Sequence, residues 1–462
     1  MPRFFTLLLA CTLIGCGSKS DAPKSVTTAS TDAVDSPASG GQSPSTSEAN
    51  SSPSSPTSPV AALQQRAQAA VSARQPQTAI EALSQAIGID PTDPNLFHMR
   101  ADVYNLMGEY ANARADYSLA VQADPKNAEL YNTRGYFLMT RGATTDALVD
   151  FNKAVELNSK FPVAWNNRGL IRLGEKNYEA AIADFSKAIE LDGKYIDALN
   201  NRGFAQMKHE KLDAALVDLK KTVTLKPDYT TAWNNCGLVY MQQENYAAAV
   251  DAFSEAIKLA PLDARWLNHR YAALQKLEKF SEANVDAQRI RWLDGLSKLT
   301  QQANQKPNDP NIWMNRAEHL AQGGEIGGAV LDYSRVIALA PGNKAALIGR
   351  AKSWLKLSDH QKAISDCNIV IAADSSPMAF SIRGDAWLAI QDFDKAIKDF
   401  EMAQRMDDAL VTAYQKRAAQ RTQTGDDKLA QEDIAKAKYL QDALAGLLTP
   451  RTAQEQIPFP TN

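Results

Sequence analysis

The chain has 462 residues, of which 50 are basic (Lys and Arg) and 53 are acidic (Asp and Glu), so its formal net charge at pH 7 is −3. This near balance gives no general electrostatic reason to expect a nucleic acid as partner. Four cysteines in a chain of this length offer no disulfide framework.

Residues 1–15 have the pattern of a short export signal. Arg3 supplies the positive charge, and the apolar core Phe4–Ile14 is too short to span a bilayer as a mature helix. The Leu-Ile-Gly-Cys sequence that ends at Cys16 resembles the bacterial lipobox, which implies cleavage before Cys16 and lipid attachment to its sulfur. An ordinary signal peptide with an incidental cysteine is the alternative. The residue after Cys16 is Gly17 and not Asp, which resembles the sorting pattern for the outer membrane. We therefore expect a lipoprotein of the cell envelope, anchored in the outer membrane rather than the inner membrane.

Residues 16–59 are rich in Ser, Thr, Pro, Ala and Gly and contain almost no large apolar residue. Such a segment cannot bury enough apolar surface to fold. A flexible chain of this length spans about 36 Å, enough to hold a folded body clear of a membrane. We therefore expect a disordered tether, whose length is either tuned for reach or merely tolerated.

From Val60 onward the sequence repeats. Alanines recur every 34 residues, apart from one interval of 46 and one of 33, at Ala79, Ala113, Ala147, Ala181, Ala215, Ala249, Ala283, Ala329, Ala363, Ala396 and Ala430. Twelve residues before each Ala lies a second column of Gly or Ala, with Tyr271 as its one exception. Gly in a helix costs about 1 kcal/mol relative to Ala, so a small residue recurring at one phase needs a packing reason. The two columns predict a seam between two helices, A and B, in each repeat.

The spacing within one repeat unit resembles the tetratricopeptide repeat. The residues that carry this resemblance are Trp233, Gly237, Tyr240, Ala249, Phe253 and Pro261. The resemblance covers residues 60–443 and implies an all-α fold, a right-handed superhelix (α-solenoid) of about eleven helix-turn-helix repeats. Each repeat in such a solenoid buries its apolar stripe against its neighbours, and there is no central core.

The interval of 46 residues divides the array. It exceeds the repeat by 12 residues, which an extended helix B or an additional helix could fill. We therefore expect a block of seven repeats at 60–297, a rephasing insertion at 298–309, a block of four repeats at 310–443, and a C-terminal cap and tail at 444–462. The repeats should begin at Val60, Pro94, Ala128, Pro162, Ile196, Thr230, Ala264, Pro310, Lys344, Pro377 and Val411.

Arg recurs at position 7 of the repeat and Asp at position 23. The pairs are Arg100 with Asp116, Arg134 with Asp150, Arg168 with Asp184, Arg202 with Asp218, Arg270 with Asp286, Arg316 with Asp332, Arg350 with Asp366, Arg383 with Asp399 and Arg417 with Asp433. In the sixth repeat Cys236 and Ala252 replace both charges together, which favours ion pairs across the seam over an ionic groove. The first repeat departs from the rule, because Arg66 stands opposite Ala82.

The resemblance to tetratricopeptide proteins also implies a concave groove lined by helix A residues at positions 2, 5, 9 and 12. Position 5 is asparagine in five consecutive repeats, at Asn132, Asn166, Asn200, Asn234 and Asn268. An amide can bond the N–H and C=O groups of an extended peptide without reading its side chains. The row is similar to the asparagine ladder of O-linked N-acetylglucosamine transferase, although no glycosyltransferase domain is present. A relic of repeat duplication is the alternative.

Apolar residues accompany this row at positions 9 and 12. They are Tyr136, Leu170, Phe204, Leu238, Met207 and Met241. We expect them to contact peptide side chains adaptably, or else to pack against neighbouring helices.

Motifs for chemistry do not occur in the sequence. The histidines lack a metal-ligand spacing, and no phosphate loop or nucleophile elbow is present. We therefore expect no catalytic residue, metal, cofactor, nucleic acid or small-molecule substrate. The function we predict is a non-enzymatic, lipid-anchored scaffold that binds an extended peptide or protein in its groove. The alternative is a structural assembly factor of an outer-membrane or secretion/pilus machine, acting through its outer face.

Overall fold

The computed structural model describes residues 58–446, which form 22 α-helices and no strand. The predicted export signal, the lipid-attachment residue Cys16, nearly all of the tether and the tail after residue 446 lie outside the described residues.

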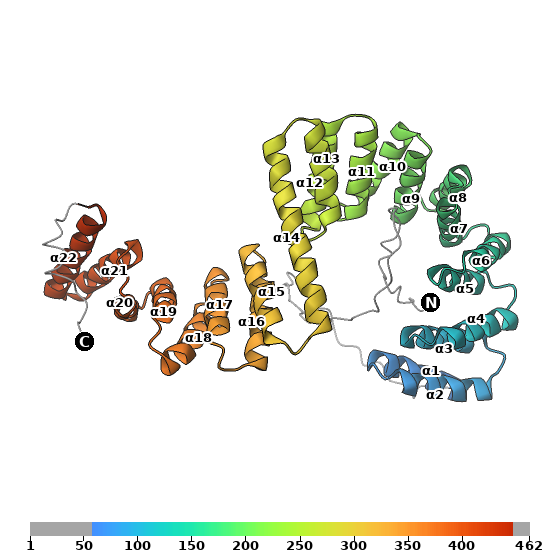
Figure 1. Ribbon diagram of the computed structural model, residues 1–462. Helices are drawn as coiled ribbons and strands as arrows, with labels where there is room; N and C mark the ends of the chain where they lie inside the picture. Colours follow the sequence, from blue (N-terminus) through green and yellow to red (C-terminus); the bar gives the residue numbers. More distant parts are fainter. Residues whose placement is uncertain (1–57, 447–462) are drawn as a thin grey trace, which may run out of the picture. The chain divides into compact units, whose positions relative to one another are not determined.

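The helices alternate between A and B, as the two small-residue columns predict (Figure 1). The A helices are α1 (Pro59–Ser72), α3 (Pro94–Met107), α5 (Ala128–Thr140), α7 (Pro162–Gly174), α9 (Ile196–Lys208), α11 (Thr230–Gln242), α13 (Ala264–Lys276), α15 (Pro310–Gln322), α17 (Lys344–Lys356), α19 (Pro377–Ala389) and α21 (Asp408–Thr424). The B helices are α2 (Pro76–Ile89), α4 (Tyr110–Ala123), α6 (Thr144–Leu157), α8 (Tyr178–Leu191), α10 (Leu212–Leu225), α12 (Tyr246–Leu259), α14 (Phe280–Gln305), α16 (Ile326–Leu339), α18 (His360–Ala373), α20 (Phe393–Met402) and α22 (Asp427–Leu444).

Nine A helices begin at the residue predicted for the start of their repeat. The exceptions are α1, which begins one residue earlier, and α21, which begins three residues earlier. Each A helix packs against its own B helix, and each B helix packs against the next A helix. The described residues therefore form an all-α helical solenoid, which confirms the predicted fold class.

The 12 extra residues lengthen a helix B, which is one of the two alternatives left open by the sequence. Helix α14 runs without a break through 26 residues and contacts both α13 and α15. The middle of α14 is joined to α15 by two hydrogen bonds: Trp292 Nε1 donates to the His319 carbonyl at 3.0 Å, and His319 Nε2 donates to the Trp292 carbonyl at 2.8 Å. Helix α14 thus serves as helix B of the seventh repeat and also packs against α15, the first helix of the next repeat.

The predicted seam between helices A and B is present. Every alanine of the 34-residue column is 0–1% exposed. A Cβ atom added at Gly237 would lie 2.4 Å from the Phe253 ring, and one at Gly169 would lie 2.7 Å from the Phe185 ring. These distances leave no room for a methyl group, so the glycines are required by close packing.

All nine predicted Arg–Asp pairs form. In each, Nε and Nη2 of the arginine donate to the two carboxylate oxygens of the aspartate, at distances from 2.5 to 2.9 Å. The aspartates are buried. In the sixth repeat Cys236 and Ala252 are buried instead, at 3% and 4% exposure. The joint loss of both charges in that repeat is explained by this pairing.

Several of these arginines also reach the preceding repeat. Nη1 of Arg202 donates to Ser186 Oγ at 3.1 Å, and Nη1 of Arg168 donates to Asn152 Oδ1 at 3.0 Å. Equivalent bonds join Arg100 to Ser84, Arg270 to Ser254, Arg350 to Ser334 and Arg383 to Asn368. One guanidinium therefore ties together its own two helices and helix B of the repeat before it.

The pair formed by Arg134 and Asp150 provides a test, because the structure gives Arg134 hydrogen bonds to this aspartate alone. We expect Asp150→Ala to lower the free energy of unfolding by about 3 kcal/mol, the lower end of the range for a buried pair, since the partly buried guanidinium of Arg134 is left unpaired. The double variant Arg134→Met with Asp150→Leu should lose much less. Urea denaturation followed by circular dichroism measures both, and equal losses in the two variants would contradict a buried pair.

Candidate functional site

The predicted site residues lie in stripes along consecutive A helices. In α9, Asn200, Phe204 and Met207 are spaced i, i+4 and i+7, which puts them on one face of the helix. Helix α11 repeats the pattern with Asn234, Leu238 and Met241. The remaining residues are Asn132 and Tyr136 on α5, Asn166 and Leu170 on α7, and Asn268 on α13. Because α5, α7, α9, α11 and α13 each contact the next helix in this series, the stripes lie side by side.

The asparagine row is covered in its middle and open at its ends. Asn166, Asn200 and Asn234 are 4%, 5% and 6% exposed, whereas Asn132 is half-buried and Asn268 is exposed. The Nδ2 of Asn268 donates to the Ala264 carbonyl of its own helix at 2.7 Å.

Each of the other four asparagines accepts a hydrogen bond from the next repeat. Asn167 Nδ2 donates to Asn132 Oδ1 at 2.9 Å. The same bond joins Asn201 to Asn166 and Asn235 to Asn200, at 3.0 Å in both cases, and His269 Nδ1 to Asn234 Oδ1 at 2.7 Å. The row is therefore a ladder of inter-repeat hydrogen bonds across five repeats.

The ladder leaves the row mainly with donor capacity. One lone pair of Oδ1 is used in four of the five asparagines, Asn132, Asn166, Asn200 and Asn234. The Nδ2 of Asn200 donates to Asn201 Oδ1 at 3.5 Å, while Nδ2 of Asn132, Asn166 and Asn234 has no acceptor among residues 58–446. From the sequence alone, each amide is expected to offer both a donor and an acceptor. In the structure, the atoms best placed for a further partner are N–H donors, which suit carbonyl oxygens.

The donors of the ladder stand at position 6 of the repeat, which is not one of the four groove positions. They are Asn167, Asn201, Asn235 and His269. Their signal is the recurring doublet Asn-Asn, which becomes Asn-His in the seventh repeat. The second residue of the doublet stands one position after the groove position and therefore points to a different side of the helix. Its recurrence indicates a repeated contact with the neighbouring A helix.

His269 closes the ladder as a neutral imidazole. Burial, with a contribution from the nearby Arg265 charge, lowers the pKa of His269 from its ordinary value of 6.5. Because Nδ1 faces an amide oxygen, this nitrogen carries the proton that it donates to Asn234.

The apolar residues beside the row pack between helices and keep part of their surface open. Leu170, Phe204, Leu238 and Met241 are half-buried, and each contacts a buried cluster between adjacent repeats. Tyr136 is 37% exposed, while Met207 is only 2% exposed. The open surface is thus narrower than the sequence pattern suggested.

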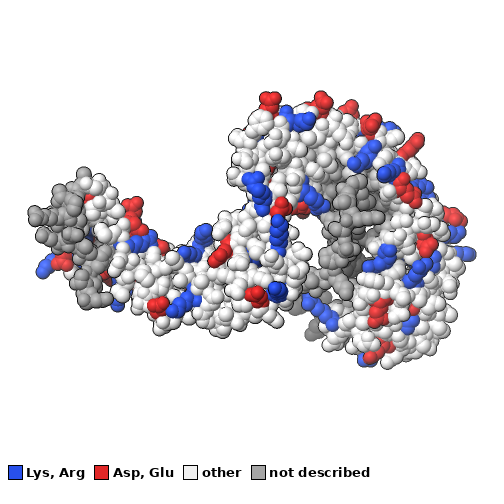
Figure 2. Space-filling model, viewed as in Figure 1, with Lys and Arg blue, Asp and Glu red and all other residues white. Residues whose placement is uncertain are grey.

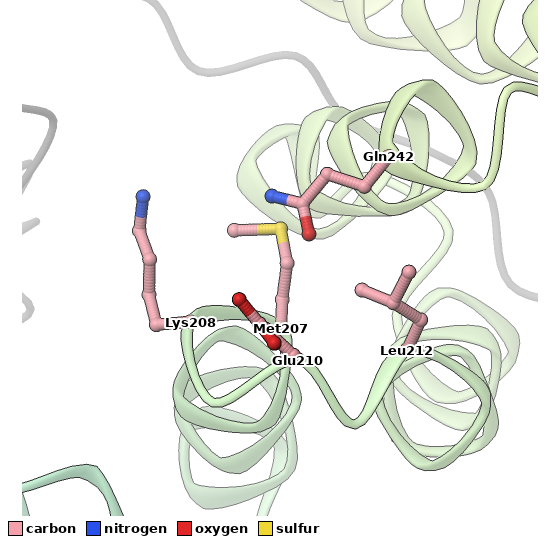
Figure 3. Close-up of a pocket in the computed structure, with 5 residues that line it drawn as sticks. All are labelled: Met207, Lys208, Glu210, Leu212 and Gln242. Atoms are coloured by element: carbon pink, nitrogen blue, oxygen red, sulfur yellow. The ribbon is translucent and has the colours of Figure 1, made fainter.

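A hollow of about 450 Å³ lies where the stripe of α9 ends (Figure 3). It is lined by Met207 and Lys208 of α9, Glu210 of the A–B turn, Leu212 of α10 and Gln242 of α11. Figure 3 shows Met207, Glu210, Leu212 and Gln242 around a common space, with Lys208 at one side.

Charges and thiols add no further site. On the face shown in Figure 2 both signs of charge are interspersed. Burial raises the pKa of the Cys236 and Cys367 thiols to about 12, which keeps them protonated at neutral pH. No group of three metal-ligating side chains occurs between residues 58 and 446.

Sequence models of the tetratricopeptide repeat match several parts of the chain. One matches residues 162–195 and 230–262, and a second matches 65–128, 98–160 and 315–377. No curated protein matches the chain.

Solved structures resemble part of the chain. MamA is 27% identical over 36% of this chain and 96% of its own, with a TM-score of 0.33. YrrB, described as a tetratricopeptide protein with an unusual peptide-binding site, is 23% identical over 40% and 94%, with a TM-score of 0.35. PilW, described as a widely conserved type IV pilus biogenesis factor, is 17% identical over 47% and 99%, with a TM-score of 0.41.

The lowered pKa of His269 predicts a pH dependence. Below about pH 6.5 the unfolded chain binds a proton at this residue that the folded chain does not, so the folded state loses stability as the pH falls. The variant His269→Asn keeps a ladder donor and removes this loss. Urea denaturation at pH 7.5 and 5.5 should show wild type falling relative to the variant, by at most about 1.4 kcal/mol per pH unit. The exposed His209→Asn is the control; parallel curves for wild type and His269→Asn would contradict the assignment.

Proposed function

We propose, from the premise that this chain is a tetratricopeptide repeat protein, that it is a non-enzymatic scaffold binding an extended peptide or protein segment. The segment lies along the A helices of repeats three to seven, that is, α5, α7, α9, α11 and α13. Its main chain meets the asparagine row, and its side chains meet the apolar residues beside that row.

The observation that carries this proposal is the ladder itself. Its bonds hold the amides of the repeats in one orientation, so the Nδ2 groups of Asn132, Asn166 and Asn234, which have no acceptor among residues 58–446, form a series of donors. Packed helices lie roughly 8 to 10 Å apart, and an extended chain advances about 3.3 Å per residue. One amide therefore stands opposite about every third carbonyl of an extended peptide. Orienting the donors before binding reduces the entropy lost when the peptide docks.

We also propose that the protein is held in the bacterial cell envelope by lipid on Cys16, with the outer membrane favoured over the inner. The support is the sequence pattern of the first 17 residues. Among residues 58–446, no helix has the length and apolar character needed to cross a membrane.

The anchor has a direct test in the full-length protein expressed in a bacterium. Cells labelled with a palmitate analogue should incorporate label into wild type, which should sediment with membranes. Cys16→Ser should carry no label and should leave the membrane fraction, because it lacks the thiol that accepts the lipid. Label or membrane retention unchanged in Cys16→Ser would contradict the proposal, and Cys11→Ser is the matched control.

One observation favours the alternative, a structural assembly factor of an outer-membrane or secretion/pilus machine. Large apolar side chains are exposed at one position of helix B in four repeats, and a partner could cover them. These are Val149, Val217, Val285 and Leu331, which are 64%, 69%, 63% and 72% exposed.

Photocrosslinking distinguishes the two functions. Benzoylphenylalanine replaces either Phe204 beside the asparagine row or Val217 on the B helix of the same repeat. Random nonapeptides displayed on phage are first selected on wild type, and a selected peptide is then irradiated with each variant. We expect crosslinking at position 204, because the groove holds the peptide, and none at 217. Crosslinking at 217 alone would favour the assembly role.

A further inference from the structure

The hollow beside Met207 coincides with a local change in the repeat. Helices α8 and α12, the B helices on either side, both begin with tyrosine, at Tyr178 and Tyr246. Helix α10 begins with Leu212, which has no ring to extend toward the neighbouring A helix. The hollow therefore lies in a repeat whose helix B begins with a smaller side chain than the B helices on either side.

The hollow continues the proposed binding stripe. Asn200 and Met207 are seven residues apart on one face of α9, which corresponds to about 10.5 Å along the helix. Met207 supplies an apolar floor and Leu212 an apolar wall. A side chain of a peptide that lies along the asparagine row can enter here.

The hollow is lined by one cation, Lys208, and one anion, Glu210, which do not pair with each other. The carboxylate of Glu210 is exposed and makes no ion pair with any residue from 58 to 446. The Nζ of Lys208 lies 5.3 Å from the centroid of the Phe204 ring, and Figure 3 shows this side chain directed away from Glu210. The amide of Gln242 faces the same space and offers a carbonyl oxygen.

A basic side chain matches this lining. Its methylene groups can lie on Met207 and Leu212, and its charged head can reach Glu210 and Gln242. An acidic side chain would be repelled by Glu210, and a wholly apolar one would desolvate that carboxylate without pairing it.

We propose that the hollow between α9, α10 and α11 is a specificity subsite for an arginine or lysine of the bound peptide. This inference rests on the proposed peptide-binding function and adds a side-chain requirement to it. The asparagine row holds the main chain without regard to sequence, and the hollow sets where along the row the basic residue lies.

The test uses the full chain and random nonapeptides displayed on phage. Peptides selected on wild type should share an arginine or lysine at one position. In fluorescence anisotropy, replacing that residue by alanine should weaken binding on the order of tenfold, as expected for a lost charge-assisted hydrogen bond. Leu212→Tyr should weaken binding similarly, because it places in the hollow the residue that begins α8 and α12.

Glu210→Gly separates recognition from folding. Glu210 has a φ of +61°, a conformation that glycine adopts more readily, so this variant should melt no lower than wild type while binding the basic peptide about tenfold more weakly. Glu244→Gly is the matched control. It has a φ of +58° at the same position one repeat later, lies outside the hollow, and should leave binding unchanged.

The outcomes distinguish this inference from the function on which it rests. Peptides that bind wild type without a shared basic residue, or that bind Glu210→Gly and Leu212→Tyr as tightly as wild type, would overturn the subsite and leave peptide binding intact. A wild-type protein that selects no peptide at all would overturn the proposed function, and the subsite with it.

Discussion

A buried carboxylate must have a cation beside it, and nine of the eleven repeats meet this requirement in the same way, with a partly buried arginine. The bidentate geometry fixes helix B against helix A, because both carboxylate oxygens are engaged at once. In six repeats the remaining nitrogen reaches helix B of the repeat before. The same side chain therefore sets the angle within a repeat and the step between repeats, and that step brings successive asparagines within hydrogen-bonding distance.

The fold was predictable because its constraints are local and repeated. A small residue at one phase, as at Gly237, can be recognised without knowing where the neighbouring repeat lies. The ion pairs were predictable because a charge buried alone is so unfavourable that both partners disappear together, as at Cys236 and Ala252. The unpaired Arg66 of the first repeat is consistent with this reasoning, because its side chain is exposed to water and its charge needs no partner.

The site was harder to predict because it depends on contacts between residues 35 positions apart in different repeats. Whether Asn200 faces a ligand or the next helix is decided by the tilt of α11 against α9, and repeat spacing does not encode that tilt. The hollow could not be predicted for another reason. It lies beside Leu212, where the neighbouring repeats have a tyrosine, and the repeat motif is defined by residues that recur rather than by those that are replaced. The partner preference of the amides, donor rather than acceptor, likewise follows only from the bonds that use Oδ1.

Helix α14 tolerates changes in repeat number less well than the two blocks that it joins. Elsewhere each 34-residue unit shares contacts only with its neighbours, so duplication or deletion of a whole unit recreates the same interfaces at the new junction. Helix α14 has no such unit boundary, because its first half completes one repeat and its second half, through Leu296, packs against the next. Evolutionary lengthening or engineered shortening of the array is thus expected on either side of this helix, whereas a recombination point inside it leaves two unfinished surfaces.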